Sequence, residues 1–175
     1  MHVTDLLADF RHEFKRHRVL AERALASLSD AQFFDSPAAH VNSPAVIVKH
    51  LAGNLVSRWT DFLTTDGDKP TRDRDGEFVI TPDDTRTALL AALERGWQAV
   101  FDTLDTLSIG DLEKTITIRG EPHTVAQALL RGLNHVAYHT GQLLYLARLF
   151  APEGPWLTIP PGQSRAARGG YRGLP

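Results

Sequence analysis

The chain has 175 residues, of which 42% are hydrophobic and 23% charged, and its formal net charge is -2 at pH 7. These values are ordinary for one globular domain. The balanced charge gives no general attraction for polyanions, so nucleic acid is not an expected partner. Cysteine is absent, which excludes disulfides, thiolate metal ligands and a cysteine nucleophile.

The N-terminal sequence MHVTDLLADFRHEFKRH is charged throughout and lacks the apolar centre of a signal peptide. No segment approaches the roughly 18 uninterrupted apolar residues of a membrane span. We therefore expect a cytoplasmic protein with no membrane partner.

Apolar residues spaced by three, four and seven predict a first amphipathic helix over about residues 3–28. Ser29 and Gln32 then form a capping pair that opens a short turn. Ser43 and Pro44 are typical of a helix start, and the second helix is expected to run to about Leu63. Residues 66–77 are rich in charge, glycine and proline, which predicts a long exposed loop.

Thr81 and Pro82 repeat the cap-then-proline pattern and predict a third helix that ends near residue 107. The alternating run at 115–119 predicts a small hairpin or extended arm. Thr124 and Gln127 open the last helix, to about Phe150. We therefore expect an all-α fold, a four-helix bundle in one domain over residues 1–162, with a flexible tail at 163–175.

His135 and His139 lie four residues apart in the last predicted helix, so both imidazoles point to the same side of it. His50 borders the apolar stripe of the second helix and is the candidate for a third ligand. The chain has eight histidines, so one such pair also arises by chance. The alternative is that these are histidines at the edge of the core, hydrogen-bonded to their neighbours.

Burial favours a metal over that alternative. His135 and His139 are flanked by Leu133, Val136 and Leu143, and an unpartnered polar group in such a place costs about 1–3 kcal/mol. One divalent ion would satisfy both rings. Three imidazoles suit zinc or nickel, with iron or copper as alternatives, and leave a position open for water, a substrate or a small thiol from outside the chain.

Three polar residues are candidates for substrate binding. Asn54 and Arg58 follow His50 at four and eight positions, and Gln142 follows His139 at three, so each shares a helix face with a histidine. Arginines on helices are more often partners in surface ion pairs, which is the alternative for Arg58.

The sequences HLAGNL at residues 50–55 and HVAYHTGQ at residues 135–142 resemble the DinB-like, or YfiT-like, superfamily of metal-dependent proteins. Residues 54–63 and 156–160 further resemble a branch of unknown function, and the resemblance covers about residues 3–162. It implies an up-down four-helix bundle whose metal ligands are His50, His135 and His139. It also implies pairing of two copies through helix faces.

Relatives of this superfamily include thiol-dependent transferases and isomerases beside proposed hydrolases. The resemblance therefore implies a metal-dependent enzyme, a hydrolase or a small-thiol S-transferase, that acts on a small molecule. One alternative is a non-catalytic protein of the stress response that binds a metal or small ligand. Another is a helical interaction module whose histidines are ordinary core residues.

Overall fold

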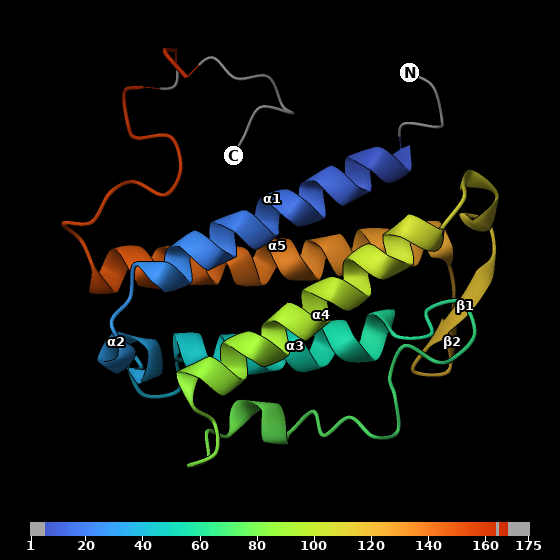
Figure 1. The fold of residues 1–175 in the computed structure, drawn as a ribbon, viewed down its shortest axis with the longest axis horizontal. Helices are drawn as coiled ribbons and strands as arrows, with labels where there is room; N and C mark the ends of the chain where they lie inside the picture. The colour runs from blue at the N-terminus through green and yellow to red at the C-terminus, as the bar shows by residue number, and fades with distance from the viewer. Residues whose placement is uncertain (1–5, 164, 168–175) are drawn as a thin grey trace.

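The computed structural model describes residues 6–163 and 165–167, and in these ranges the chain is mostly helical (Figure 1). Two 3-10 turns and a two-stranded antiparallel sheet accompany the α-helices. In chain order the elements are α1 (Leu6–Ala26), α2 (Asp30–Phe34), α3 (Pro44–Trp59), η2 (Gly76–Phe78), α4 (Arg86–Thr106), η3 (Ile109–Asp111), β1 (Thr115–Ile118), β2 (Glu121–Thr124) and α5 (Val125–Phe150).

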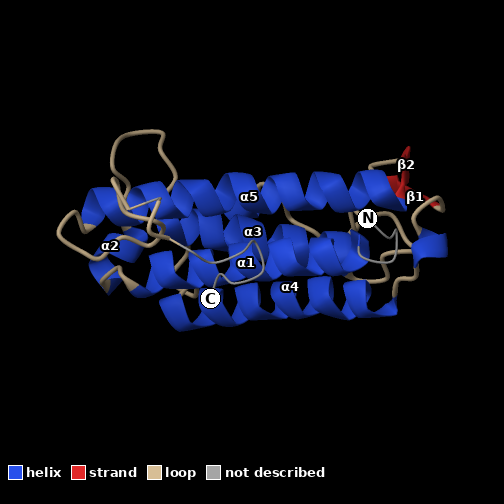
Figure 2. Cartoon of the chain, turned by 90° about the horizontal axis from the view of Figure 1, so that it is seen from above, coloured by secondary structure: helices blue, strands red, loops and turns tan. Residues whose placement is uncertain are grey.

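The four long helices α1, α3, α4 and α5 lie along one another, with α3 packed on α4 and α1 on α5 (Figures 1 and 2). Side chains from all four fill the space between them, and Phe14, Leu51, Trp97 and Val136 are almost completely buried. The hairpin formed by β1 and β2 lies at one end of the helices, and α2 lies at the other (Figure 2). Both the predominance of helix and the small hairpin confirm the sequence prediction.

The expected up-down order was wrong, because α3 and α4 run in the same direction (Figure 1). Lys49 near the start of α3 bonds to Asp84 just before α4. At the other end, Trp59 at the end of α3 accepts a hydrogen bond from Thr103 near the end of α4.

Two predicted helix boundaries were wrong. The third helix begins at Arg86, capped by Thr85, and not at Pro82. The carboxylate of Asp84 accepts hydrogen bonds from the backbone and hydroxyl of Thr81, which folds this segment into a separate turn. The second helix ends at Trp59 instead of Leu63, because Asp61 adopts a positive φ of 49° that a right-handed helix cannot contain.

The segment at 66–77 is only in part the exposed loop that its composition predicted, since residues 70, 71 and 73–75 are exposed but others are buried. Arg72 has only 4% of its side chain exposed, and Glu77 is also buried. Near its start, Gly67 donates a backbone hydrogen bond to Thr117 of the hairpin and accepts one from the hydroxyl of Ser57. These contacts hold the segment against α3 and the hairpin.

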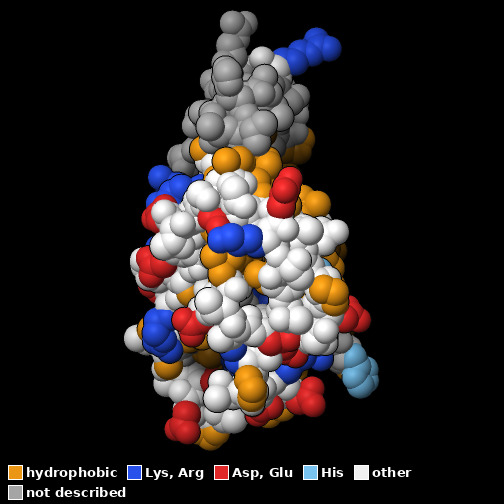
Figure 3. All heavy atoms as spheres, turned by 90° about the vertical axis from the view of Figure 1, so that its right-hand side faces the viewer, with side chains coloured by type: hydrophobic (Ala, Val, Ile, Leu, Met, Phe, Trp, Pro, Cys, Tyr) orange, Lys and Arg blue, Asp and Glu red, His pale blue; other side chains and the backbone are white. Residues whose placement is uncertain are grey.

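Figure 3 views the end of the molecule that carries the hairpin, where basic and acidic side chains are interspersed. Within the described residues, no helix is both long enough and apolar enough to cross a bilayer. Most of the predicted tail, residue 164 and residues 168–175, lies outside the part of the chain that the structure describes.

Candidate metal centre

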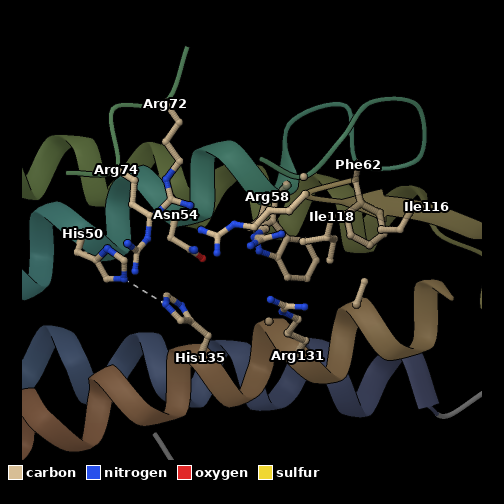
Figure 4. A pocket seen from close by; sticks show the side chains of 15 residues that line it. His50, Asn54, Arg58, Phe62, Arg72, Arg74, Ile116, Ile118, Arg131 and His135 are labelled. Atoms are coloured by element: carbon tan, nitrogen blue, oxygen red, sulfur yellow. Dashed lines mark hydrogen bonds between the residues drawn. The ribbon is translucent and has the colours of Figure 1, made fainter. Parts of the chain in front are cut away.

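The helices α3 and α5 bring three histidines together in the interior. His50 lies in the second turn of α3, while His135 and His139 lie near the middle of α5. His50 and His139 are 6% and 7% exposed, and His135 is half-buried. The Nε2 atom of His135 lies 3.3 Å from that of His50 and 3.2 Å from that of His139. Figure 4 shows the rings of His50 and His135 facing each other from opposite helices.

These spacings fit a shared metal ion. Two imidazole nitrogens bound tetrahedrally to zinc, at about 2.0–2.1 Å each, stand about 3.3–3.4 Å apart. One ring nitrogen from each histidine lies within 4.8 Å of the other two. His50 and His135, which are 85 residues apart in sequence, therefore already present their nitrogens at the separation that a shared divalent ion requires.

The ring nitrogens that face away from this point are partly fixed by hydrogen bonds. His50 Nδ1 lies 2.8 Å from Oε2 of Glu77, and His139 Nδ1 lies 2.8 Å from Oε1 of Gln142. Both partners are acceptors, so each neutral ring carries its proton on Nδ1 and turns the Nε2 lone pair inward. This outer contact is typical of metal-binding histidines, whose second nitrogen donates to a carboxylate or amide oxygen.

Within the part of the chain that the structure describes, His135 has no such outer partner. Its Nδ1 is buried and has no hydrogen-bond partner among the described residues. Burial, helped by the neighbouring His139 and His50, lowers the pKa of His135 to about 3. Burial likewise lowers the pKa of His139. A neutral His135 carries at most one proton on Nε2, so it can donate to His50 or to His139 but not to both. At least one inward-facing Nε2 lone pair is therefore left without a donor, and a cation would satisfy it.

A buried ion-pair network supports His50 from behind. Glu77 lies on η2, and its two carboxylate oxygens accept hydrogen bonds of 2.7 and 2.8 Å from Arg72. Burial alone would raise the pKa of Glu77, but the hydrogen bonds from Arg72 and His50 outweigh it and keep that pKa below its ordinary value. The carboxylate is therefore ionised at neutral pH and orients the imidazole of His50.

A cavity of about 180 Å³ opens beside His50 and His135. The histidines form one end, and the wall continues along α3 and α5 to the hairpin (Figure 4). Asn54 and Arg58 of α3 both line this cavity. The donors on its wall come from arginine and asparagine side chains, which are groups that bind polar ligands.

The family model described as "Protein of unknown function (DUF1572)" matches residues 2–163. The chain belongs to this family. A crystal structure of a conserved protein from Enterococcus faecalis is similar, with 21% sequence identity and a TM-score of 0.60 over 87% of this chain and 99% of that chain. At this identity the likeness concerns the fold alone. No curated protein matches the chain significantly.

In this DUF1572 protein, the residues expected at the site divide into two groups. The structure brings Asn54 and Arg58 to the cavity beside the histidines, whereas Gln142 lies behind His139 and accepts its Nδ1 proton. Their contact with a substrate stays a prediction. Sequence reasoning missed Glu77 and Arg72, because residues in a loop have no periodic spacing that relates them to a helix face.

Proposed function

We propose that this chain is a metal-dependent enzyme of the DinB-like superfamily, a hydrolase or a small-thiol S-transferase that acts on a small molecule. The ion would be zinc or nickel, held by His50, His135 and His139. The observation that carries the proposal is the convergence of three ring nitrogens, two pairs of them 3.2 and 3.3 Å apart, at the end of a cavity. A site with three protein ligands keeps a position open, as catalytic sites do.

A four-helix bundle of the DinB-like type, in which α3 and α4 run in the same direction, is the fold that we propose for this enzyme. Support comes from the four long helices that lie along one another and from the conserved Enterococcus faecalis protein of similar fold. The site depends on this arrangement, because His50 comes from α3 and the other two ligands come from α5.

Three of the chain's own side chains would prepare the site. Glu77 and Gln142 each hold one imidazole in the tautomer whose Nε2 faces inward. Arg72 keeps Glu77 ionised and fixed. The bound ion would supply Lewis acidity toward a substrate carbonyl, water or an external thiol. Since the chain has no cysteine, any thiol in the reaction must be a co-substrate.

The test is elemental analysis of tag-free protein together with the variants His50→Ala and His139→Ala. We expect close to one zinc or nickel per chain in the wild type and loss of the metal in both variants. His123→Ala is the matched control, since this histidine is on the hairpin outside the metal site. A wild type that contains no metal, and takes up none with a gain in melting temperature, would contradict the proposal.

Activity separates the enzyme from a binding protein. The metal-loaded wild type should turn over ester substrates or couple a small thiol to an electrophile, and His50→Ala should do neither. Metal retention without any such turnover would instead support the non-catalytic role in binding a metal or small ligand.

A further inference from the structure

The cavity beside the histidines is strongly basic. Five arginines line it, and no aspartate or glutamate does so within the described residues. They come from α3, from the segment at 66–77, from the hairpin turn and from α5, as Figure 4 shows in part. These arginines are Arg58, Arg72, Arg74, Arg119 and Arg131.

Three of the five already have partners. Arg72 binds Glu77 and lies 3.4 Å from Asp68, and the Nε of Arg119 lies 3.0 Å from the same aspartate. Arg74 lies over the ring of Phe78, 5.8 Å from its centroid. The charges of Arg72 and Arg119 are therefore balanced by carboxylates, and that of Arg74 is stabilised by the aromatic face of Phe78.

Arg58 and Arg131 are different. Arg58 is half-buried and makes no ion pair or hydrogen bond with any described residue, and its Nη1 is completely buried. Burial, followed by repulsion from Arg131, lowers the pKa of Arg58 to about 10. The charge of Asp68 acts against this lowering, but Asp68 forms no ion pair with Arg58. Within the part of the chain described, Arg131 makes one hydrogen bond, to a ring nitrogen of His123 at 3.0 Å. A half-buried guanidinium without a hydrogen-bonded anion carries a desolvation cost, which an anionic ligand would offset.

The two arginines lie on the same side of the histidines. On α3, Arg58 follows His50 by eight residues, about 12 Å along the helix axis. On α5, Arg131 precedes His135 by one turn, about 6 Å, on the same face. The two helices run in opposite directions here, so both arginines extend into the cavity beyond the histidines (Figure 4).

Gly67 makes room for this arrangement. A Cβ at position 67 would lie 3.3 Å from both Cδ and Nη1 of Arg58. Beyond the arginines the wall is apolar, formed by Trp59, Phe62 and Ile118 among others. The volume of about 180 Å³ is below the roughly 300–1,000 Å³ of pockets for drug-sized ligands. The occupant is therefore a small molecule.

We propose that Arg58 and Arg131 bind the carboxylate or phosphate group of a small substrate, whose reactive end lies at the three-histidine site. Planar guanidinium groups match both oxyanions through paired hydrogen bonds. The position of the reactive end rests on the proposed function, whereas the binding of the anion does not.

The test uses full-length protein, both metal-free and zinc-loaded, titrated with inorganic phosphate and with propionate in a calorimeter. The variants are Arg58→Met and Arg131→Met. Arg95→Met is the matched control, because this exposed arginine on α4 bonds only to the Ala91 carbonyl of its own helix. Zinc content is measured in every variant, and melting temperature is followed in parallel. Metal-free protein excludes binding of the anion to zinc.

We expect saturable binding of at least one anion to metal-free wild type and to Arg95→Met, weakened at least 10-fold in Arg58→Met and Arg131→Met. Phosphate alone or propionate alone would identify the group. Arg58→Met should also melt above the wild type without anion, since it removes a buried charge; if it fails to fold, the exposed Arg131→Met carries the test.

No saturable binding to wild type, or equal binding to all four proteins, would overturn the inference. The zinc measurement is read separately. If the chain binds an anion but takes up no zinc, the arginine site is supported and the metal proposal is contradicted. If the chain takes up zinc but binds neither anion, the metal proposal is supported and the arginine site is contradicted.

Discussion

Gly53 of α3 leaves the space in which the carboxylate of Glu77 lies. A Cβ at position 53 would stand 2.7 Å from Cδ of Glu77, closer than nonbonded carbon atoms approach. That carboxylate accepts the Nδ1 proton of His50, three residues before Gly53 on the same helix. The orientation of His50 therefore depends on the absence of a side chain at 53.

The substitution Gly53→Ala should displace Glu77 and loosen His50. Because loss of such outer contacts costs metal-binding histidines about 10–100-fold in affinity, we expect zinc affinity to fall by at least about 10-fold. Competition with a chromophoric chelator measures this. The control is Gly141→Ala on α5, where a Cβ would meet nothing within 4 Å. The control should keep its affinity and gain about 0.5–1 kcal/mol in stability, and equal affinities in both variants would refute the role of Gly53.

Metal removal should lower the melting temperature. An ion present at 100 times its dissociation constant stabilises the folded state by about 2.7 kcal/mol, and at about 2–4 °C per kcal/mol this is a shift of about 5–11 °C. Scanning calorimetry with and without a chelator measures it. His135→Ala should melt at one temperature in both conditions, whereas His123→Ala should keep the shift. A chelator that leaves the wild-type melting temperature unchanged would mean that the histidines hold no ion.

Much of the helical architecture could be predicted from local signals. Capping side chains fix where α3 and α5 begin: Ser43 accepts from the backbone of Val46, and Thr124 from that of Gln127. The i,i+4 spacing of His135 and His139 brings their rings 4.5 Å apart, as expected for neighbours on one helix face. The assignment of His50 as the third ligand depended on the family resemblance as well.

The remainder of the site depends on tertiary contacts that produce no periodic pattern in the sequence. Glu77 approaches His50 across 27 residues, through a segment whose composition is that of a surface loop. Charge and glycine predict exposure, but Arg72 and Glu77 neutralise each other inside the protein. Arg131, in contrast, could have been predicted from the sequence. It lies one turn before His135 on the same helix face, and the same spacing argument identified Asn54 and Arg58.

Thr103 of α4 should stabilise the fold without affecting the metal. Its buried hydroxyl donates a 2.8 Å hydrogen bond to the carbonyl of Trp59 at the end of α3. Thr103→Val keeps the shape and removes the donor, so we expect a loss of about 1–2 kcal/mol. Thr106→Val is the matched control, because this exposed hydroxyl bonds only within its own helix; its change should stay within about 0.5 kcal/mol. Urea denaturation compares them, and similar losses would contradict the prediction.

Asp66 joins the segment at 66–77 to the hairpin. Its carboxylate accepts hydrogen bonds from the backbone of Asp68, Arg119 and Gly120, at 2.7, 2.8 and 2.8 Å. The bonds from Gly120 and Asp68 are the main causes that lower the pKa of Asp66. A carboxylate whose folded pKa is lowered stabilises the fold above its unfolded pKa, and this contribution is lost as the pH falls through the folded pKa.

Asp66→Asn should therefore cost about 1 kcal/mol at pH 7, and the difference from wild type should shrink as the pH falls below about 4. Urea denaturation of both proteins at pH 7, 5, 4 and 3 measures the difference. The control is Asp83→Asn, an exposed carboxylate outside this junction, which should match the wild type throughout. Because Asp66 anchors the turn that carries Arg119 rather than any histidine, zinc affinity should stay unchanged. A difference of equal size at pH 7 and pH 3 would show that the ionised form has no special role in this junction.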